Sequence, residues 1–258
     1  MREWTREERY RVLHSADEIA DLHDRNAKSV YRQTYHVQPI TGLSSDPNGF
    51  VLFKGTWHLC YQWCPWGAVH GLKYWYHATS PDLIHWNNAG VGMWPDTEYD
   101  NKGCHSGSAI TDGKELYFFY TGNHRDENWV RTPYTCAAIM DAEGALKKLP
   151  EPLFGPRPDY SEHQRDPKVF YIAEKERYYI FIGAQTQDGK GCVQVYQSKS
   201  SSPAGNSPGS SRSRATRTSA ACGSARAFRT SPARTYCCSP RSTPNCRAAA
   251  RARTTTSI

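Results

Sequence analysis

Short segments rich in aromatic and β-branched residues recur along most of the chain, and Gly, Pro, Asn and Asp separate them. Little helical pattern lies between these segments, so their spacing predicts an all-β architecture built from hairpins or blades. The expected strands are Gly49–Lys54, Thr56–Trp63, Leu72–Thr79, Gly107–Thr111, Glu115–Thr121, Tyr134–Met140, Lys168–Ile172, Arg177–Ala184 and Cys192–Lys199. No exact internal repeat is present, so periodicity alone does not identify a propeller.

The first 30 residues have a different pattern, which predicts a short helical N-terminal extension. Arg6–Val12 and Ser15–Ala27 are rich in helix formers, and Ser15 and Glu18 have the spacing of a capping box. This segment is highly charged and lacks the apolar run of a secretory signal, and no stretch of the sequence reaches the ~20 apolar residues of a membrane span. We therefore expect a cytoplasmic protein with no membrane partner.

The composition changes again at about Ser200. Residues 200–258 consist mainly of Ser, Ala, Arg, Thr and Pro, with almost no Leu, Ile or Val. Such a segment cannot bury enough apolar surface to offset its ordering entropy, so it is expected to be disordered. The sequence thus divides into a helical extension (1–30), a β-rich region (31–199) and a tail (200–258).

Charge and cysteine content narrow the function classes. The formal net charge is +7, but the tail holds ten Arg and no acidic residue, which leaves residues 1–199 at about −3. The basic charge therefore gives no reason to expect a nucleic-acid partner, and Arg without interleaved aromatic residues is weak evidence for RNA binding. The five cysteines of residues 1–199 lack paired CxxC spacing, which argues against a zinc site or a disulfide framework.

Three segments offer candidate chemistry, although each has an ordinary structural explanation when taken alone. Asp46 precedes Pro-Asn-Gly, a combination that makes tight turns. Arg165-Asp166-Pro167 precedes an expected strand, where an Arg beside an Asp is usually a surface pair. His105–Ala109 places small polar groups at the start of a strand.

The order of these segments is more informative than any one of them. The series is Tyr35-His36-Val37-Gln38-Pro39, Asp46-Pro47-Asn48-Gly49, Trp57-His58-Leu59-Cys60-Tyr61-Gln62, Tyr74–Trp86, Ser106-Gly107-Ser108-Ala109, Tyr120-Thr121-Gly122-Asn123 and Arg165-Asp166-Pro167-Lys168-Val169. From about Tyr10 to Lys199 it resembles glycoside hydrolase family 32, which contains invertase, β-fructofuranosidase and sucrose-6-phosphate hydrolase. The resemblance implies a five-bladed β-propeller followed by a β-sandwich. Residues 31–199 would form about the first three blades, and the β-sandwich would be absent.

The resemblance also implies roles for particular residues. Asp46 matches the catalytic nucleophile, and Asp166 matches the carboxylate that stabilises the transition state. The fructose pocket would be lined by Asn48, Gln62, Trp66, Ser106 and Arg165. The implied reaction releases fructose from sucrose, sucrose 6-phosphate or short fructo-oligosaccharides with retention at the anomeric carbon, which needs two carboxyl groups and no metal or organic cofactor. The chain departs from the family pattern at Ser45, Tyr76 and His105, where Asn, Gly and Phe are usual.

One catalytic group of the family has no match. Its acid/base is the Glu of a Trp-Glu-Cys-Pro motif, but the last Glu here is Glu176 and no acidic residue follows Asp188. The codons of Ala221–Arg226, read one nucleotide earlier, can encode Met-Trp-Glu-Cys-Pro. We therefore interpret the tail as out-of-frame translation after a frameshift near Ser200–Pro203.

Three hypotheses follow for the function. The parent gene would encode an active fructosidase, whereas this chain would be a sugar-binding pseudoenzyme or a fragment that does not fold. The last is favoured by the sequence, because a propeller with about three blades leaves open sheet edges that are prone to aggregation.

Overall fold

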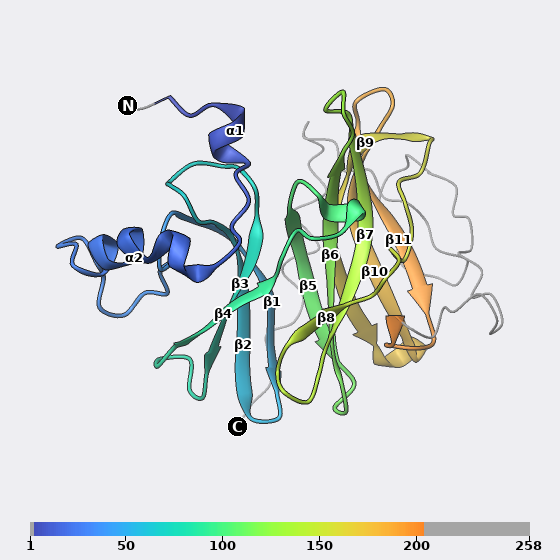
Figure 1. Cartoon of the computed structure of the whole chain (residues 1–258). Coiled ribbons are helices and arrows are strands. Elements are labelled where there is room, and N and C mark those ends of the chain that lie inside the picture. Colours follow the sequence, from blue (N-terminus) through green and yellow to red (C-terminus); the bar gives the residue numbers. More distant parts are fainter. Residues whose placement is uncertain (1–2, 204–258) are drawn as a thin grey trace, which may run out of the picture.

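A computed structural model describes residues 3–203 and contains three antiparallel sheets that stand side by side (Figure 1). The first sheet has the order β1 (Leu43–Phe53), β2 (Thr56–Cys64), β3 (Tyr74–Ser80), β4 (Asn87–Met93). The second has the order β5 (Cys104–Thr111), β6 (Leu116–Arg125), β7 (Arg131–Met140), β8 (Leu146–Lys148). The third contains β9 (Tyr160–Ile172), β10 (Arg177–Thr186) and β11 (Gly191–Ser198), with β10 in the middle. The expected disorder of the tail concerns residues that lie almost entirely outside the described part of the chain.

This arrangement confirms the prediction of an all-β fold made of about three propeller blades. Each expected strand is present, while β4 and β8 are two additional strands that the sequence did not indicate. Asn87–Met93 contains two Gly and a single β-branched residue, and Leu146–Lys148 is only three residues long. Both strands lie at the end of a sheet, where the neighbouring strand supplies their hydrogen bonds.

The prediction of a tight turn at Pro47-Asn48-Gly49 is wrong, because these residues lie inside β1. The ladder with β2 shifts register between Ser45 and Pro47 and again between Asn48 and Val51. Proline cannot donate to a ladder, and a bulge accommodates it by leaving a residue unpaired. Asp46, at φ +31°, is that residue. The turn-forming sequence therefore produces a bulge that moves Asp46 out of the regular pleat.

The same departure occurs in the third sheet. Asp166 has φ +65° within β9, and the ladder with β10 shifts register beside it, between Phe181 and Gly183. The sequence placed Asp166 just before a strand that starts at Lys168, whereas β9 starts at Tyr160. Non-glycine residues at positive φ are uncommon and often mark functional sites.

Apolar side chains between the sheets hold the blades together. Trp75, Phe118 and Tyr120 are buried between the first two sheets, and the indole ring of Trp75 meets both of the other rings edge-on at 6.5 and 6.0 Å. On the opposite face of the second sheet, Phe119 and Val169 belong to a separate buried cluster that joins it to the third. Strand alternation explains this division, because successive residues of β6 point to opposite faces.

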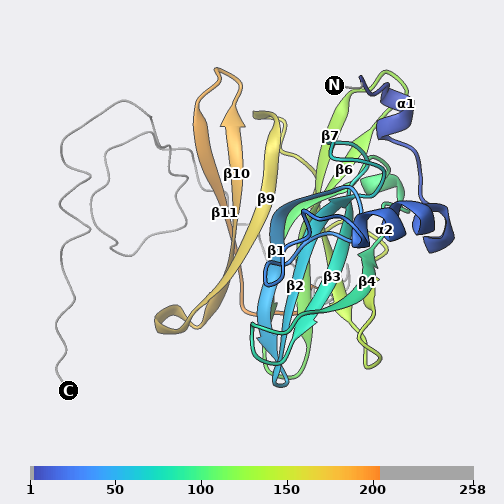
Figure 2. The same ribbon diagram turned by 90° about the vertical axis from the view of Figure 1, so that its left-hand side faces the viewer.

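The N-terminal extension contains α1 (Arg6–Arg9), a 3₁₀ turn (Ala16–Ile19) and α2 (Ala20–Ala27). The predicted capping box at Ser15 is present, since the Glu18 carboxylate accepts a hydrogen bond from the Ser15 N–H at 3.2 Å. The first helix is shorter than expected and ends at Arg9. Leu13 and Ile19 are buried in the same cluster as Trp63, so the extension packs against the first blade, as both views show (Figure 2).

Two further features concern buried polar groups. The five cysteines of the described residues are all buried. His58 on β2 and His77 on β3 stack, and their Nδ1 and Nε2 atoms lie 3.0 Å apart. Burial and the neighbouring His58 lower the pKa of His77 to about 4.

Between residues 3 and 203 there is no helix with the length and apolar character needed to traverse a bilayer.

Candidate active site

The first strand of each sheet contributes one residue to a shared polar site. These strands, β1, β5 and β9, are neighbours in space and carry Asp46, Ser106 and Asp166 respectively. The Ser106 hydroxyl donates to Asp46 Oδ2 at 2.6 Å and accepts from Gln62 Nε2 at 2.6 Å. A hydrogen bond to one carboxylate oxygen fixes the orientation of the group and leaves its other oxygen for a substrate atom.

Asn48 fixes the spacing between the first two blades at this site. Its side-chain amide donates to the Asp46 carbonyl at 2.6 Å, and its oxygen accepts from the Gly107 N–H at 2.9 Å. Gly107 also lets β5 lie close to β6, because a β-carbon there would lie 1.9 Å from the Phe119 carbonyl oxygen. Asn48 is therefore buried beneath Asp46 and joins β1 to β5.

Asp166 faces the same site from the third blade. Its N–H donates to Thr121 Oγ1 at 2.9 Å, and its Oδ2 lies 3.7 Å from Arg165 Nε. Burial and then the negative charge of Asp46 raise the pKa of Asp166 above its ordinary value, while Arg165 and Lys73 oppose that rise. The charge of Asp46 therefore influences the ionisation of Asp166, as expected when two carboxyl groups share a site.

Lys73 is a member of this site that sequence reasoning missed. Its ammonium group donates to Gln62 Oε1, which also accepts from the Ser45 hydroxyl at 3.3 Å. With the amide oxygen engaged by Lys73, the amide N–H of Gln62 points to Ser106. Lys73 precedes β3 and lies just outside the motifs, so no pattern in the sequence marked it.

Of the predicted pocket residues, Trp66 is placed differently from the rest. Its indole N–H donates to the Arg11 carbonyl at 2.8 Å, and the Arg11 guanidinium lies 3.8 Å from the ring centroid. The structure thus gathers Asp46, Asn48, Gln62, Ser106, Arg165 and Asp166, and sets Trp66 against the N-terminal extension. A sugar contact by Trp66 stays a prediction.

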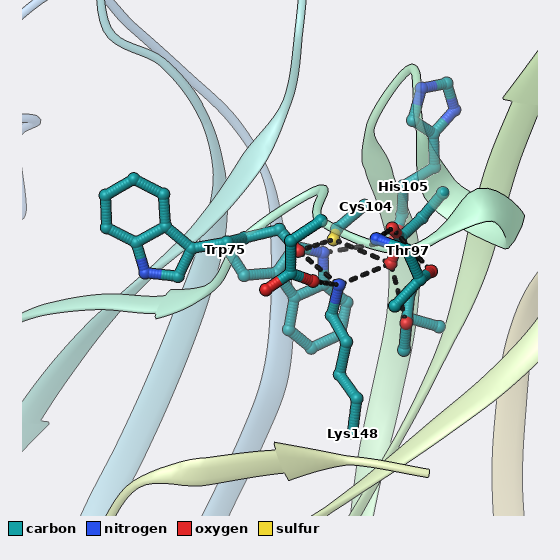
Figure 3. A network of polar contacts seen from close by, with 9 residues as sticks. Trp75, Thr97, Cys104, His105 and Lys148 are labelled. Carbon is teal, nitrogen blue, oxygen red and sulfur yellow. Dashed lines mark hydrogen bonds and ion pairs between the residues drawn. The ribbon is translucent and has the colours of Figure 1, made fainter. Parts of the chain in front are cut away.

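A buried ionic network anchors the segment that leads into β5 (Figure 3). Lys148 of β8 contacts Asp100 Oδ2 at 2.5 Å and Asp96 Oδ1 at 2.8 Å. The Asp100 carboxylate, which is fully buried, also accepts from Thr97 and from the Tyr120 hydroxyl at 2.9 Å. Cys104, the first residue of β5, lies four residues after Asp100 and its thiol contacts Asp100 Oδ2 at 3.6 Å, so this network holds the start of the strand that presents Ser106.

A cavity of about 560 Å³ opens beside Asp166 on the third blade. Its walls are formed by β9, β10 and β11, including Arg165, Gly183 and Val193. No cluster of three or more His, Cys, Asp or Glu side chains that could hold a metal ion occurs in the part of the chain that the structure describes.

Comparison with known proteins agrees with this geometry. The profile of the N-terminal domain of glycosyl hydrolases family 32 matches residues 36–203. The chain belongs to glycoside hydrolase family 32. The match includes every residue of the polar site and all three blades.

The similar proteins are longer than this chain. A sucrose-6-phosphate hydrolase from Lactococcus lactis is 43% identical over 199 residues, which cover 75% of this chain and 41% of the relative. The solved sucrose-6-phosphate hydrolase from Lactobacillus gasseri has 42% identity and a TM-score of 0.73 over 76% of this chain and 41% of its own. A β-fructofuranosidase from Bombyx mori has 32% identity and a TM-score of 0.61, covering 71% of this chain and 39% of its own. The chain spans about two fifths of the length of the relatives that it matches.

Proposed function

We propose that this chain carries the fructosyl-binding part of a glycoside hydrolase site that releases fructose from sucrose or sucrose 6-phosphate. Asp46 would act as the nucleophile of a retaining double displacement, and Asp166 would stabilise the oxocarbenium-like transition state. The observation that carries the proposal is the hydrogen-bonded chain Gln62–Ser106–Asp46, with Asp166 acting on the same site from the next blade. The hydrogen-bonded chain orients one carboxylate oxygen of Asp46. The carboxyl group of Asp166 remains to bind sugar hydroxyls.

The names of the relatives support a sucrose-type substrate. Both bacterial relatives described above are sucrose-6-phosphate hydrolases, and the insect relative is a β-fructofuranosidase. The shared fold and the position of Asp46 on the innermost strand favour the same bond class here. Short fructo-oligosaccharides form a second substrate class within the proposal, and the cytoplasmic location expected from the charged N-terminus remains a prediction.

The sequence as printed lacks the acid/base Glu, so we propose that it binds the sugar without efficient turnover. General acid catalysis contributes about 10²–10⁴-fold, and its loss leaves the glycosidic oxygen without a proton donor. The frameshift near Ser200–Pro203 is part of this proposal, because the restored frame can encode Trp-Glu-Cys-Pro. The alternative is a fragment whose open third blade prevents stable folding.

Fructose release from sucrose tests the proposal in three proteins: the printed chain, a frame-restored chain and its Asp46→Asn variant. We expect hydrolysis only in the restored chain with Asp46 intact, and sucrose binding without turnover in the printed chain. A restored, well-folded protein that releases no fructose from sucrose or sucrose 6-phosphate would overturn the assignment. A soluble, monomeric printed chain with a cooperative melt would exclude the non-folding alternative.

A further inference from the structure

The hairpin between β6 and β7 brings two arginines together beside the proposed sugar site. Arg125 is the last residue of β6 and Arg131 the first of β7, and the register pairs them directly. Directly opposed residues of an antiparallel pair lie on the same face with their β-carbons about 5 Å apart, and like charges in this position are destabilising. A two-residue contact of this kind needs a compensating anion.

Neither arginine finds that anion among the residues that the structure describes. The Nε atoms of Arg125 and Arg131 are both buried and have no hydrogen-bond partner. Arg125 donates through Nη1 to the Trp129 carbonyl, and neither guanidinium makes an ion pair with any residue between 3 and 203. Buried polar groups are nearly always satisfied, so two orphaned guanidinium donors side by side indicate an absent acceptor.

More cations surround the same hairpin. The Arg6 guanidinium lies 4.6 Å from the centroid of the Trp129 ring, the Arg125 guanidinium 5.3 Å and the Lys102 ammonium 5.8 Å. These basic groups come from α1, β6 and the segment before β5, which are distant in sequence. Their convergence on one indole ring concentrates positive charge at the hairpin.

The acidic groups near the hairpin do not neutralise this charge. The Asp126 carboxylate accepts from the Val130 N–H and so closes the turn. Glu162 acts on Arg131 only at long range, while burial and the charges of Arg125 and Arg165 lower the Arg131 pKa. Like charges therefore dominate the surroundings of Arg131.

The arginines lie on the face of the second blade that meets Asp166. Strand alternation puts Arg125 on the same face of β6 as Thr121, whose hydroxyl accepts the Asp166 N–H. At about 3.4 Å per residue, the four-residue step from Thr121 to Arg125 spans about 14 Å.

His105 links the two regions. Burial, followed by the charges of Lys73, Arg131 and Arg165, lowers the pKa of His105 to about 3. His105 immediately precedes Ser106, the hydrogen-bond donor to Asp46. The arginine hairpin and the carboxylate site therefore adjoin, since charged groups of both regions act on His105.

We propose that Arg125 and Arg131 form a phosphate subsite that binds the phosphorylated sugar attached to the fructosyl unit. This inference rests on the proposed function of Asp46 and Asp166 as the fructosyl site. The planar guanidinium matches phosphate oxygens in pairs of parallel hydrogen bonds, and a phosphate dianion balances two arginines. The subsite explains why two like charges are kept opposite each other at a cost in stability.

Isothermal titration of the full chain with sucrose and with sucrose 6-phosphate tests the subsite. We expect sucrose 6-phosphate to bind at least about tenfold more tightly, since charge-assisted hydrogen bonds contribute that much or more. Arg131→Gln and Arg125→Gln should each reduce this preference about tenfold or more. Lys114→Gln, an exposed basic residue in the loop at the other end of β6, is the matched control and should keep the preference.

Thermal unfolding gives a readout that is independent of sugar binding. Inorganic phosphate should raise the melting temperature of the unaltered chain more than chloride at equal ionic strength, and Arg131→Gln should abolish the difference. Without phosphate, Arg131→Gln should melt at the same or a higher temperature, because it removes a partly buried cation that has no ion-pair partner among the described residues. A lower temperature would contradict the inference.

The outcomes separate this inference from the proposed function. Equal affinity for sucrose and sucrose 6-phosphate in the unaltered chain would overturn the phosphate subsite and leave the fructosyl site intact. Failure to bind either sugar would count against the proposed function. The effect of phosphate on the melting temperature would then test on its own whether Arg125 and Arg131 bind an anion. An equal phosphate effect in the unaltered chain and in Arg131→Gln would refute the assignment of these residues.

Discussion

Replacing Lys148 by Met isolates the energetic role of the buried ionic network that leads into β5. Methionine keeps the length and apolar stem of the side chain but removes the cation that contacts Asp100 and Asp96. The fully buried Asp100 carboxylate then loses its counter-ion (Figure 3). Removing one partner of a buried pair costs about 3–5 kcal/mol. Asp100 retains donors from Thr97 and Tyr120, so we expect a value near the lower end, about 3 kcal/mol.

Urea unfolding followed by tryptophan fluorescence measures this loss, and a scan should show the melting temperature falling by roughly 6–12 °C. The matched control is Lys147→Met, since the adjacent Lys147 is 69% exposed and pairs with Asp141 at 3.5 Å. An exposed pair contributes at most about 1 kcal/mol. The double variant Asp100→Asn/Lys148→Met should be less destabilised than Lys148→Met alone, because no unpaired charge remains. Equal effects of Lys148→Met and Lys147→Met would refute the reasoning.

Three further predictions concern other parts of the fold. The pKa of His77 is about 4 in the folded chain, against 6.5 in the unfolded chain, so the folded state binds fewer protons. The free energy of unfolding should therefore fall by about 3 kcal/mol as the pH falls from 6.5 towards 4. His77→Gln should flatten this dependence in unfolding curves measured at several pH values. Gly107→Ala should abolish soluble expression, since its β-carbon would lie 1.9 Å from a backbone oxygen. In the control Gly113→Ala the β-carbon meets no atom within 4 Å, so the variant should cost only the backbone strain of positive φ, about 1–2 kcal/mol. Similar soluble yields of both variants would contradict this. Asp46→Asn should lower the pKa of Asp166, because the charge of Asp46 contributes to its rise, and a carboxyl-carbon NMR titration that shows no shift would refute the coupling.

Much of the fold could be predicted because strands that pack on both faces are rich in aromatic and β-branched residues. Segments such as Leu116–Arg125 are dense in aromatic residues, since one face meets the first blade and the other meets the third. The outer strands Asn87–Met93 and Leu146–Lys148 bury little, so their sequences lack this enrichment. The bulge at Asp46 was also missed, because local turn chemistry at Pro47-Asn48-Gly49 was overridden by pairing with β2.

The polar site was predictable only as far as its residues lie within recognisable motifs. Asp46, Ser106 and Asp166 were found in this way, although their contacts depend on three strands that are distant in sequence. Lys73 could not be found, since its role arises from the antiparallel placement of β2 beside β3. The sugar contact expected of Trp66 stays a prediction, and the hydrogen bond of its indole to Arg11 in the N-terminal extension was not expected from the motifs.

Two kinds of departure from ordinary structural rules occur in and beside the polar site. Asp46 and Asp166 hold positive φ within strands, and Arg125 and Arg131 hold like charges opposite each other with buried donors unsatisfied. Each of these features costs stability on its own. Natural proteins keep such violations where binding or catalysis requires them, and the surrounding structure compensates. The paired aromatic cores between the blades and the buried Lys148 network provide that compensation, which is why strain can persist at the carboxylates and at the arginine hairpin together.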